Sequence, residues 1–245
     1  MSQIRKRRRV TTTKYEIIQT ALNMFVEYGY SKTSPKMIAK ELDISLGNIT
    51  YYFPTKEHLL AILIEMLAKY QWRAAKDAVD DGESDITALC FELTAMAVMC
   101  EESEVARDLY IAAYTKQMAL DMVRTNDVKR AKEVFAGVCP DWTDEQFRQA
   151  ELLVSGIEYA TLRTTSDSPP LETRIAGAMN SILAIYNVPE ERRRMKVERA
   201  LSLDYRKFGR EVLQGFVKYV ADTTESYFDR FEQVGRHYVL KKETE

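Results

Sequence analysis

Residues 45–57 read SLGNITYYFPTKE, and this short stretch decides how the first part of the chain folds. Ser45 is a favourable helix N-cap, and Pro54 ends that helix because the residue before a proline is pushed out of helical geometry. The last turn carries three consecutive aromatic residues, 51–53. A buried helix has little use for two phenolic hydroxyls unless each finds a partner, whereas a helix that contacts a polyanion can use both.

This segment is the third of three helices that the sequence predicts in the first part of the chain. A first helix is expected from about 11 to 28, with Gly29 at its end. A second short helix is expected over 34–42, and a tight turn separates it from the third. Two short capped helices joined by a tight turn are the layout of the helix-turn-helix DNA-binding motif.

The third helix divides into an apolar face and a polar face. Ile49 and Phe53 lie four residues apart and are predicted to face the neighbouring helices. The residues that then face outward are small, polar or phenolic: Gly47, Asn48, Thr50 and Tyr51. Asparagine and threonine can contact base edges, and tyrosine hydroxyls can reach phosphates. For Tyr52, packing between helices and contact with DNA both remain open.

The charge of the chain is divided unequally. The net charge is only −2, but residues 1–56 hold ten Lys/Arg against four acidic residues, and the remainder is correspondingly acidic. Residues 5–9 near the N-terminus are five consecutive Lys or Arg residues. Such a run is usually a solvated tail, but beside a helix-turn-helix it favours an arm that reaches an adjacent groove of DNA. We expect residues 1–10 to be a basic disordered arm, with Arg7, Arg8 and Arg9 as DNA contacts.

Residues 13–67 resemble the DNA-binding domain of the TetR family of bacterial transcription regulators. The resemblance rests on F-x-E-x-G-Y at the end of the first helix, I-A in the second, and I-S-x-G-x-I-x-Y-Y-F-x-x-K-E-x-L-L from the third onward. It implies that the third helix enters the major groove. The DNA-contacting residues that it implies are Ser34, Pro35, Lys36, Asn48, Ile49, Thr50, Tyr51, Tyr52 and Lys56. Two positions depart from the family pattern: Thr50 replaces a usual tyrosine, and Asp43 replaces a common glycine.

The rest of the chain is also predicted to be helical, which makes the fold class all-α. Few glycines and prolines interrupt it, and no sustained alternation of apolar and polar residues indicates a strand. Further helices are expected near 84–101, 103–121, 125–137, 143–163, 171–187, 190–202 and 205–240. We expect a DNA-binding domain over 11–58 and a larger ligand-binding and dimerisation domain over 59–245.

The resemblance implies a homodimer and a pocket for a small inducer in the second domain. Candidate pocket residues come from an aromatic and methionine-rich stripe that is more often core than ligand site: Phe91, Met99, Tyr110, Tyr114, Met118 and Tyr159. Segments 143–164 and 171–187 suit dimerisation, with Ala150, Leu153, Gly156, Ile157 and Ala160 forming a face of mainly small residues. The helix 205–240 could cover the pocket, extend the interface or complete the core.

The composition argues against other classes of protein. Three cysteines and two histidines give no metal spacing, and no phosphate-binding loop or nucleophile elbow is visible, so neither an enzyme nor a cofactor is expected. The cysteines are predicted to be buried and reduced. No signal peptide or membrane span is recognised, which favours a cytoplasmic protein without a membrane partner.

Two hypotheses therefore compete. The first is a homodimeric repressor that binds palindromic double-stranded operator DNA and is released by a small hydrophobic or amphipathic ligand. The second is a constitutive DNA-binding or recruiting factor with a solid core. A closed cavity of several hundred Å³ would favour the first hypothesis. The identity of the inducer, the operator sequence, the regulated genes and the choice between repression and activation cannot be read from the sequence.

Overall fold

The computed structural model of the chain describes residues 2–79 and 84–240, with side chains described over 14–79 and 84–222. Within these ranges the chain forms eleven α-helices and no strand, which confirms the all-α prediction. The helices are α1 (Ser2–Tyr28), α2 (Pro35–Glu41), α3 (Leu46–Tyr52), α4 (Lys56–Ala78), α5 (Asp85–Glu102), α6 (Glu104–Thr115), α7 (Gln117–Val134), α8 (Asp144–Leu162), α9 (Leu171–Ile185), α10 (Glu190–Ser202) and α11 (Tyr205–Leu240).

Two helix boundaries differ from the prediction. The break expected between 121 and 125 lies instead at Lys116, whose backbone is extended (φ −94°, ψ 124°) and separates α6 from α7. Neither glycine nor proline marks this position, so packing sets the break. The backbone of residues 2–10 is helical and continues α1, where a disordered arm was expected. No glycine or proline interrupts residues 2–28, and lysine and arginine are good helix formers.

The short helices form where local sequence signals place them. The side-chain oxygens of Ser34 and Ser45 accept hydrogen bonds from the backbone N–H groups of Met37 and Asn48, which caps α2 and α3. Asp43 lies between the two helices at φ 50°, the left-handed region where glycine is common. Asp43 therefore adopts the turn conformation that glycine usually adopts at this position in the family.

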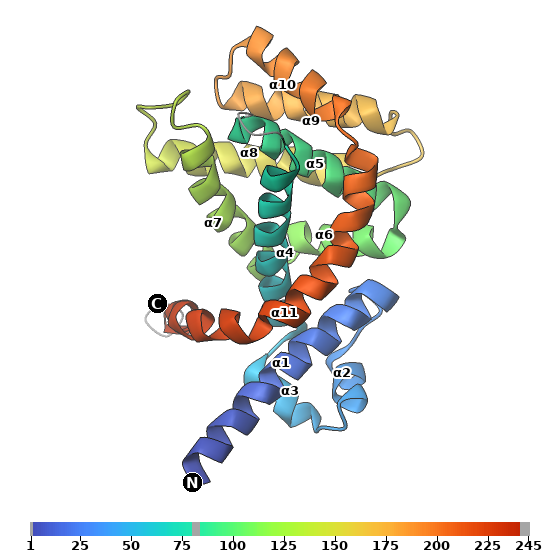
Figure 1. The fold of residues 1–245 in the computed structure, drawn as a ribbon, viewed down its shortest axis with the longest axis vertical. Helices are drawn as coiled ribbons and strands as arrows, with labels where there is room; N and C mark the ends of the chain where they lie inside the picture. The colour runs from blue at the N-terminus through green and yellow to red at the C-terminus, as the bar shows by residue number, and fades with distance from the viewer. Residues whose placement is uncertain (1, 80–83, 241–245) are drawn as a thin grey trace.

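The helices are arranged as a small head and a larger body (Figure 1). Helices α1–α3 lie at one end, and α4 leads from them into the body, where it packs against α5, α6, α7 and α11. Helix α5 is buried over nearly its whole length. The long helix α11 runs beside α5 and also contacts α1, which closes the gap between body and head. The domain boundary near residue 58 stays a prediction because α4 spans it.

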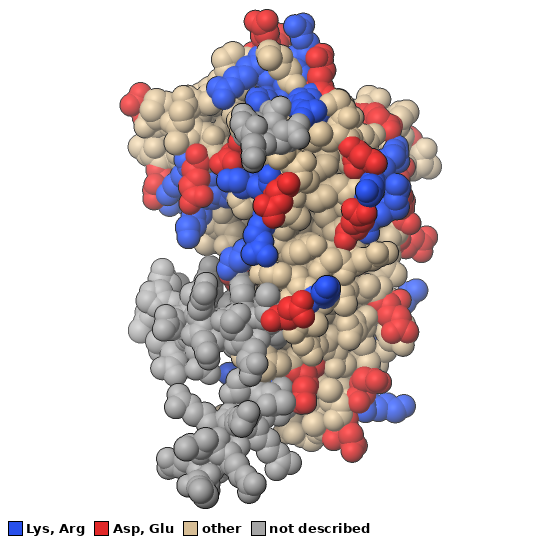
Figure 2. All heavy atoms as spheres, in the orientation of Figure 1, with Lys and Arg blue, Asp and Glu red and all other residues tan. Residues whose placement is uncertain are grey.

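The surface charge of the body is mixed. On the face shown in Figure 2, Lys and Arg side chains alternate with Asp and Glu side chains over the described helices of the body. Charged side chains of the body also form ion pairs, including Lys76 with Asp85 at 2.9 Å and Arg174 with Glu101 at 2.6 Å. This face therefore carries no single-sign field that would by itself attract a polyanion.

Candidate functional site

Helix α3 presents an exposed polar face at the surface of the head. Tyr51 is 80% exposed, and the other residues predicted to face outward, Gly47, Asn48 and Thr50, are also exposed. The Thr50 hydroxyl donates weakly, at 3.3 Å, to the carbonyl oxygens of Leu46 and Gly47 within the helix. Figure 1 places α3 on the outer side of the head, away from the body.

Two residues implied as DNA contacts have other roles. Ile49 is 0% exposed and packs in the core with Ile38 and Phe53, so its assignment as a DNA contact was wrong. Lys56 is half-buried, and its ammonium donates hydrogen bonds to the carbonyl oxygens of Tyr30 and Thr33 at 2.7 and 2.9 Å. Burial lowers the pKa of Lys56. Its ammonium therefore holds the loop between α1 and α2 against the start of α4.

The remaining candidate DNA contacts are partly or fully accessible. Ser34 and Pro35 are half-buried at the start of α2, and Lys36 is exposed beside them. Tyr52 is half-buried: its ring packs edge-on against Tyr51 at 5.0 Å, and the Lys14 ammonium lies 5.5 Å from its centre. The side chains of Arg7, Arg8 and Arg9 lie outside the described residues.

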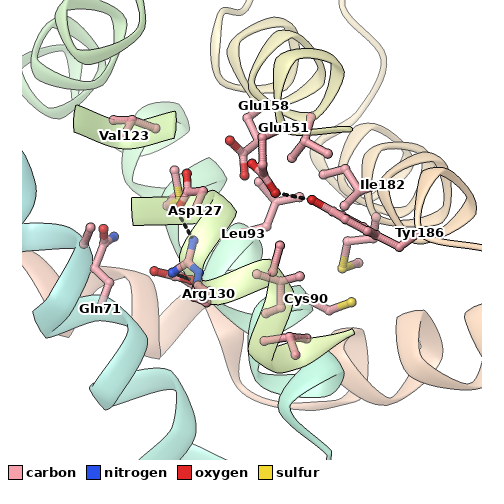
Figure 3. Close-up of a pocket in the computed structure, with 18 of the residues that line it drawn as sticks. Gln71, Cys90, Leu93, Val123, Asp127, Arg130, Glu151, Glu158, Ile182 and Tyr186 are labelled. Atoms are coloured by element: carbon pink, nitrogen blue, oxygen red, sulfur yellow. Dashed lines mark hydrogen bonds and ion pairs between the residues drawn. The ribbon is translucent and has the colours of Figure 1, made fainter. Parts of the chain in front are cut away.

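A cavity of about 70 Å³ lies in the body, among α4 to α9 (Figure 3). Of the candidate pocket residues, Tyr110 and Tyr114 line it. Phe91, Met99, Met118 and Tyr159 are not among the residues that line it. Phe91 instead stacks on Phe208 of α11 at 4.5 Å, and the hydroxyl of Tyr159 accepts a hydrogen bond from Arg163.

The cavity also contains charged residues that the sequence analysis did not select. Arg130 of α7 donates hydrogen bonds to Glu92 of α5 at 2.8 Å and to Asp127 at 2.6 Å. Two further carboxylates, Glu151 and Glu158, project from α8 toward the same space (Figure 3). Both lie on the core side of α8, at a spacing of seven residues that places them on one face. Acidic residues at core positions of an amphipathic helix were the signal that could have revealed the site.

Each of these two glutamates accepts a hydrogen bond from a tyrosine. The hydroxyl of Tyr186 donates to Glu151, and the hydroxyl of Tyr114 donates to Glu158 at 2.9 Å. Burial raises the pKa of Glu151 to about 8 and that of Glu158 well above its usual range. Burial likewise raises the pKa of Glu92 to about 7, against the opposing charge of Arg130. Burial in the cavity thus shifts all three carboxyls toward the protonated form.

The cavity is connected to the head through α6. Asp108, on the same helix as Tyr110, accepts a hydrogen bond from the backbone N–H of Ser31 at 2.7 Å. Gly29 makes this contact possible, because its φ is +92° and a Cβ there would lie 2.9 Å from a carboxylate oxygen of Asp108. A displacement of α6 at the cavity therefore acts directly on the loop that precedes α2.

Comparison with known proteins assigns the family. Residues 17–63 match the family model described as "Bacterial regulatory proteins, tetR family". The "Probable HTH-type transcriptional regulator YttP" of Bacillus subtilis is 32% identical over 160 residues, which cover 63% of this chain and 74% of that protein. The chain belongs to the TetR family. It is a DNA-binding transcriptional regulator of this family and not an enzyme, as predicted.

Other TetR-family relatives match over different lengths. The "Uncharacterized HTH-type transcriptional regulator YuxN" of Bacillus subtilis is 38% identical over 80 residues, 33% of this chain and only 28% of that protein. Among solved structures, a gamma-butyrolactone receptor (ArpA-like protein) aligns with a TM-score of 0.46 at 20% identity, covering 80% of this chain and 97% of the other. CprB from Streptomyces coelicolor, solved in complex with its operator, aligns with a TM-score of 0.43 at 22% identity over 79% of this chain and 97% of the other.

The body also carries, on α8 and α9, the face of mainly small residues that was predicted for dimerisation. Leu153, Gly156 and Ala160 are exposed on α8, whereas Ala150 is buried in the core, so its assignment to this face was wrong. Helix α9 adds the exposed Gly177, and a Cβ at Gly156 or Gly177 would meet nothing within 4 Å. Within the described residues the two helices thus present a surface that allows close approach of another helix.

The cysteine prediction is confirmed, because Cys90, Cys100 and Cys139 are free and buried. Burial raises the pKa of Cys90 and of Cys100 to about 12, which keeps both thiols protonated. Over the described part of the TetR-family chain, no helix combines the length and apolar character that crossing a bilayer requires.

Proposed function

We propose that the protein is a homodimeric repressor that acts in the cytoplasm and leaves its operator when a small amphipathic ligand enters the body cavity. The observation that carries this proposal is that α4 and α6 both line the cavity and both form hydrogen bonds to the loop between α1 and α2 in the head. A ligand can lower DNA affinity only if it binds better to a conformation in which the two heads are wrongly spaced.

The DNA-binding part of the proposal concerns the exposed face of α3. Asn48 and Thr50 contact base edges, and Tyr51 contacts phosphate or base, because their side chains are exposed on one helix of the head. Ser34, Pro35 and Lys36 contact the DNA backbone at the start of α2. Arg7, Arg8 and Arg9, at the start of α1, add electrostatic contacts, and Tyr52 supports Tyr51 from its half-buried position.

The dimer forms through α8 and α9, whose exposed small residues allow close packing against the same helices of a second copy. In such a dimer two α3 helices read half-sites about one turn of DNA apart, roughly 34–36 Å, which requires a palindromic operator. Small shifts of each head then change the spacing of the pair.

The cavity volume bears on the competing hypothesis. At about 70 Å³ it is smaller than the ~300–1,000 Å³ typical of ligand pockets. A ligand of ordinary size must therefore push the surrounding helices apart, and this expansion is what would move α4 and α6. A constitutive regulator is the alternative that the small volume favours, and it would bind its operator with the same affinity whatever ligand is supplied.

A selection from a random duplex library tests the DNA-reading face. The wild-type protein should enrich a palindrome, and Thr50→Ala and Tyr51→Ala should lose or change that preference with unchanged thermal stability and dimer mass. Tyr28→Ala is the matched control, because Tyr28 is exposed on the head but lies at the end of α1. Wild-type affinity in both α3 variants would refute the assignment of this face.

A further inference from the structure

We propose that the cavity binds a small organic cation, a protonated amine with an apolar body, and that Glu151 and Glu158 are its anionic partners. The proposal rests on the proposed function, since it names the chemical class of the inducer. Four carboxylates and one base are found among the described residues that line the cavity: Glu92, Asp127, Glu151, Glu158 and Arg130. This excess of acidic side chains in a buried space is relieved either by protonation or by a bound cation.

The single base of the cavity is already engaged. The two terminal nitrogens of Arg130 each donate a hydrogen bond, one to Glu92 and one to Asp127, and all three side chains are largely buried. This arrangement satisfies the guanidinium with two carboxylates. Glu151 and Glu158 are left without an ion pair to any Lys or Arg of the described lining.

These two glutamates are buried and only half satisfied. Glu151 is 4% exposed and Glu158 is 8% exposed. In the described part of the chain each carboxylate accepts one hydrogen bond, Glu151 from Tyr186 and Glu158 from Tyr114, so one oxygen of each is free. Figure 3 shows both side chains directed into the space that Asp127 and Arg130 also face. Two free carboxylate oxygens on one side of a cavity are acceptors for the N–H groups of an ammonium ion.

The rest of the cavity lining suits the hydrocarbon part of such an amine. Leu93, Val123 and Ile182 are among the aliphatic residues that surround the polar groups (Figure 3). The rings of Tyr186 and Phe135 stack at 3.9 Å and close one wall. A water needs about 10–15 Å³ of such space, so a cavity of about 70 Å³ holds only a few non-hydrogen atoms before the helices must move. A short alkyl amine therefore fits better than a large drug-like cation.

Binding of an ammonium ion has a signature that binding of a neutral ligand lacks. Burial raises the pKa of Glu151 to about 8 and also raises that of Glu158, which favours the protonated form of both carboxyls in the free protein. An ion pair with the amine requires the ionised form, so each carboxylate that pairs must release its proton to the solvent. The charged and titratable groups that act on these glutamates are Tyr114 from α6, Arg124, Asp127 and Arg130 from α7, and Tyr186, and Glu92 from α5 lies beyond Arg130. Glu92, whose pKa is raised to about 7, can take up part of a released proton at pH 7, so fewer protons than are released from Glu151 and Glu158 then reach the solvent.

The test uses the full-length protein and three probes that share a four-carbon chain and differ in charge: n-butylamine, n-butanol and butyrate. We expect n-butylamine to raise the thermal midpoint and to bind in calorimetry with proton release, seen as a dependence of the heat on the ionisation enthalpy of the buffer. n-Butanol and butyrate should do neither. Glu158→Gln and Glu151→Gln should each weaken n-butylamine binding about tenfold or more, because each removes a charged acceptor.

The control is Glu145→Gln, on the same helix but exposed and paired with Arg148 at 2.8 Å, which should bind n-butylamine like the wild type. The glutamine variants of Glu151 and Glu158 should fold, because they remove a buried charge while keeping side-chain shape. The proposal is overturned if n-butanol binds as well as n-butylamine. It is equally overturned if no amine from ethylamine to hexylamine binds, or if both glutamine variants bind n-butylamine like the wild type.

The same probes separate this inference from the repressor proposal when the selected operator duplex is added. Release of the duplex by butyrate or n-butanol, but not by n-butylamine, would overturn the cation site and leave the ligand-released repressor standing. Binding of n-butylamine with proton release but no change in duplex affinity would support the cation site and refute release from DNA.

Discussion

Replacing Glu151 by glutamine should stabilise the protein in alkaline solution and much less in mild acid. The pKa of Glu151 is raised by burial to about 8, against an ordinary value of 4.5. Between these two values the folded protein holds a proton that the unfolded chain has lost. Stability therefore falls as the pH rises through this window, since the folded state binds more protons than the unfolded state.

The magnitude follows from the width of the window. From about pH 5.5 to about pH 8 the wild type should lose roughly 3 kcal/mol of unfolding free energy through this group, at about 1.4 kcal/mol per unit. Glutamine cannot ionise, and its oxygen can still accept the hydrogen bond from Tyr186. The advantage of Glu151→Gln over the wild type should therefore grow by about that amount between the two pH values.

Urea-induced unfolding followed by far-ultraviolet circular dichroism at both pH values measures this difference, at one fixed protein concentration because a dimer is expected. Glu145→Gln is the control: the same substitution at an exposed position of α8 should change stability little and equally at both pH values. If Glu151→Gln differed from the wild type by the same amount at both pH values, the raised pKa and the reasoning built on it would be refuted.

Four further outcomes are expected. Arg130→Met should destabilise the protein by about 3–5 kcal/mol at pH 8 by leaving Glu92 and Asp127 unpaired, with a smaller loss at pH 5; an equal loss at both pH values would contradict the pairing. Lys56→Met should cost about 1–3 kcal/mol in unfolding free energy by losing its two internal hydrogen bonds, with no change in the salt dependence of DNA binding. A slope flattened by ~0.9 would instead make Lys56 a phosphate contact. Deleting residues 1–9 should weaken binding to all duplexes and flatten that slope by ~0.9 per lost phosphate contact, and an unchanged slope would exclude the basic segment from the interface. Asp108→Ala should leave n-butylamine affinity intact but reduce duplex release, and full release would show that α6 does not carry the coupling.

The head could be predicted from sequence because its determinants are local. Ser34, Ser45 and Pro54 fix the ends of α2 and α3 within a few residues of themselves, and the spacing of Ile49 and Phe53 fixes which face of α3 is buried. Lys56 shows where this reasoning stops. Its position in the first turn of a helix suggested a phosphate contact, but its hydrogen-bond partners Tyr30 and Thr33 lie far back in the chain.

The cavity could not be predicted in the same way. Its charged residues come from α5, α7 and α8, which are separated in sequence and meet only through packing. Local signals of the kind that mark a capped helix do not exist for such a site: Phe91 and Met99 were chosen for their side-chain type and lie in the core instead. Only the placement of Glu151 and Glu158 among the buried residues of α8 distinguishes them from solvated glutamates.

The cost of these buried carboxyls is itself an argument for their role. A core that served stability alone would place apolar residues at 151 and 158, because burying ionisable groups without full pairing is unfavourable. Either a proton or an organic cation relieves that cost, and both act on the cavity that α4 and α6 share with the head. A cation that displaces the proton gains most from conformations in which the cavity is wide enough to hold it. If those conformations are also the ones in which Ser31 and the α2 segment have moved, one set of buried charges links the choice of ligand, the pH dependence of stability and the release of DNA.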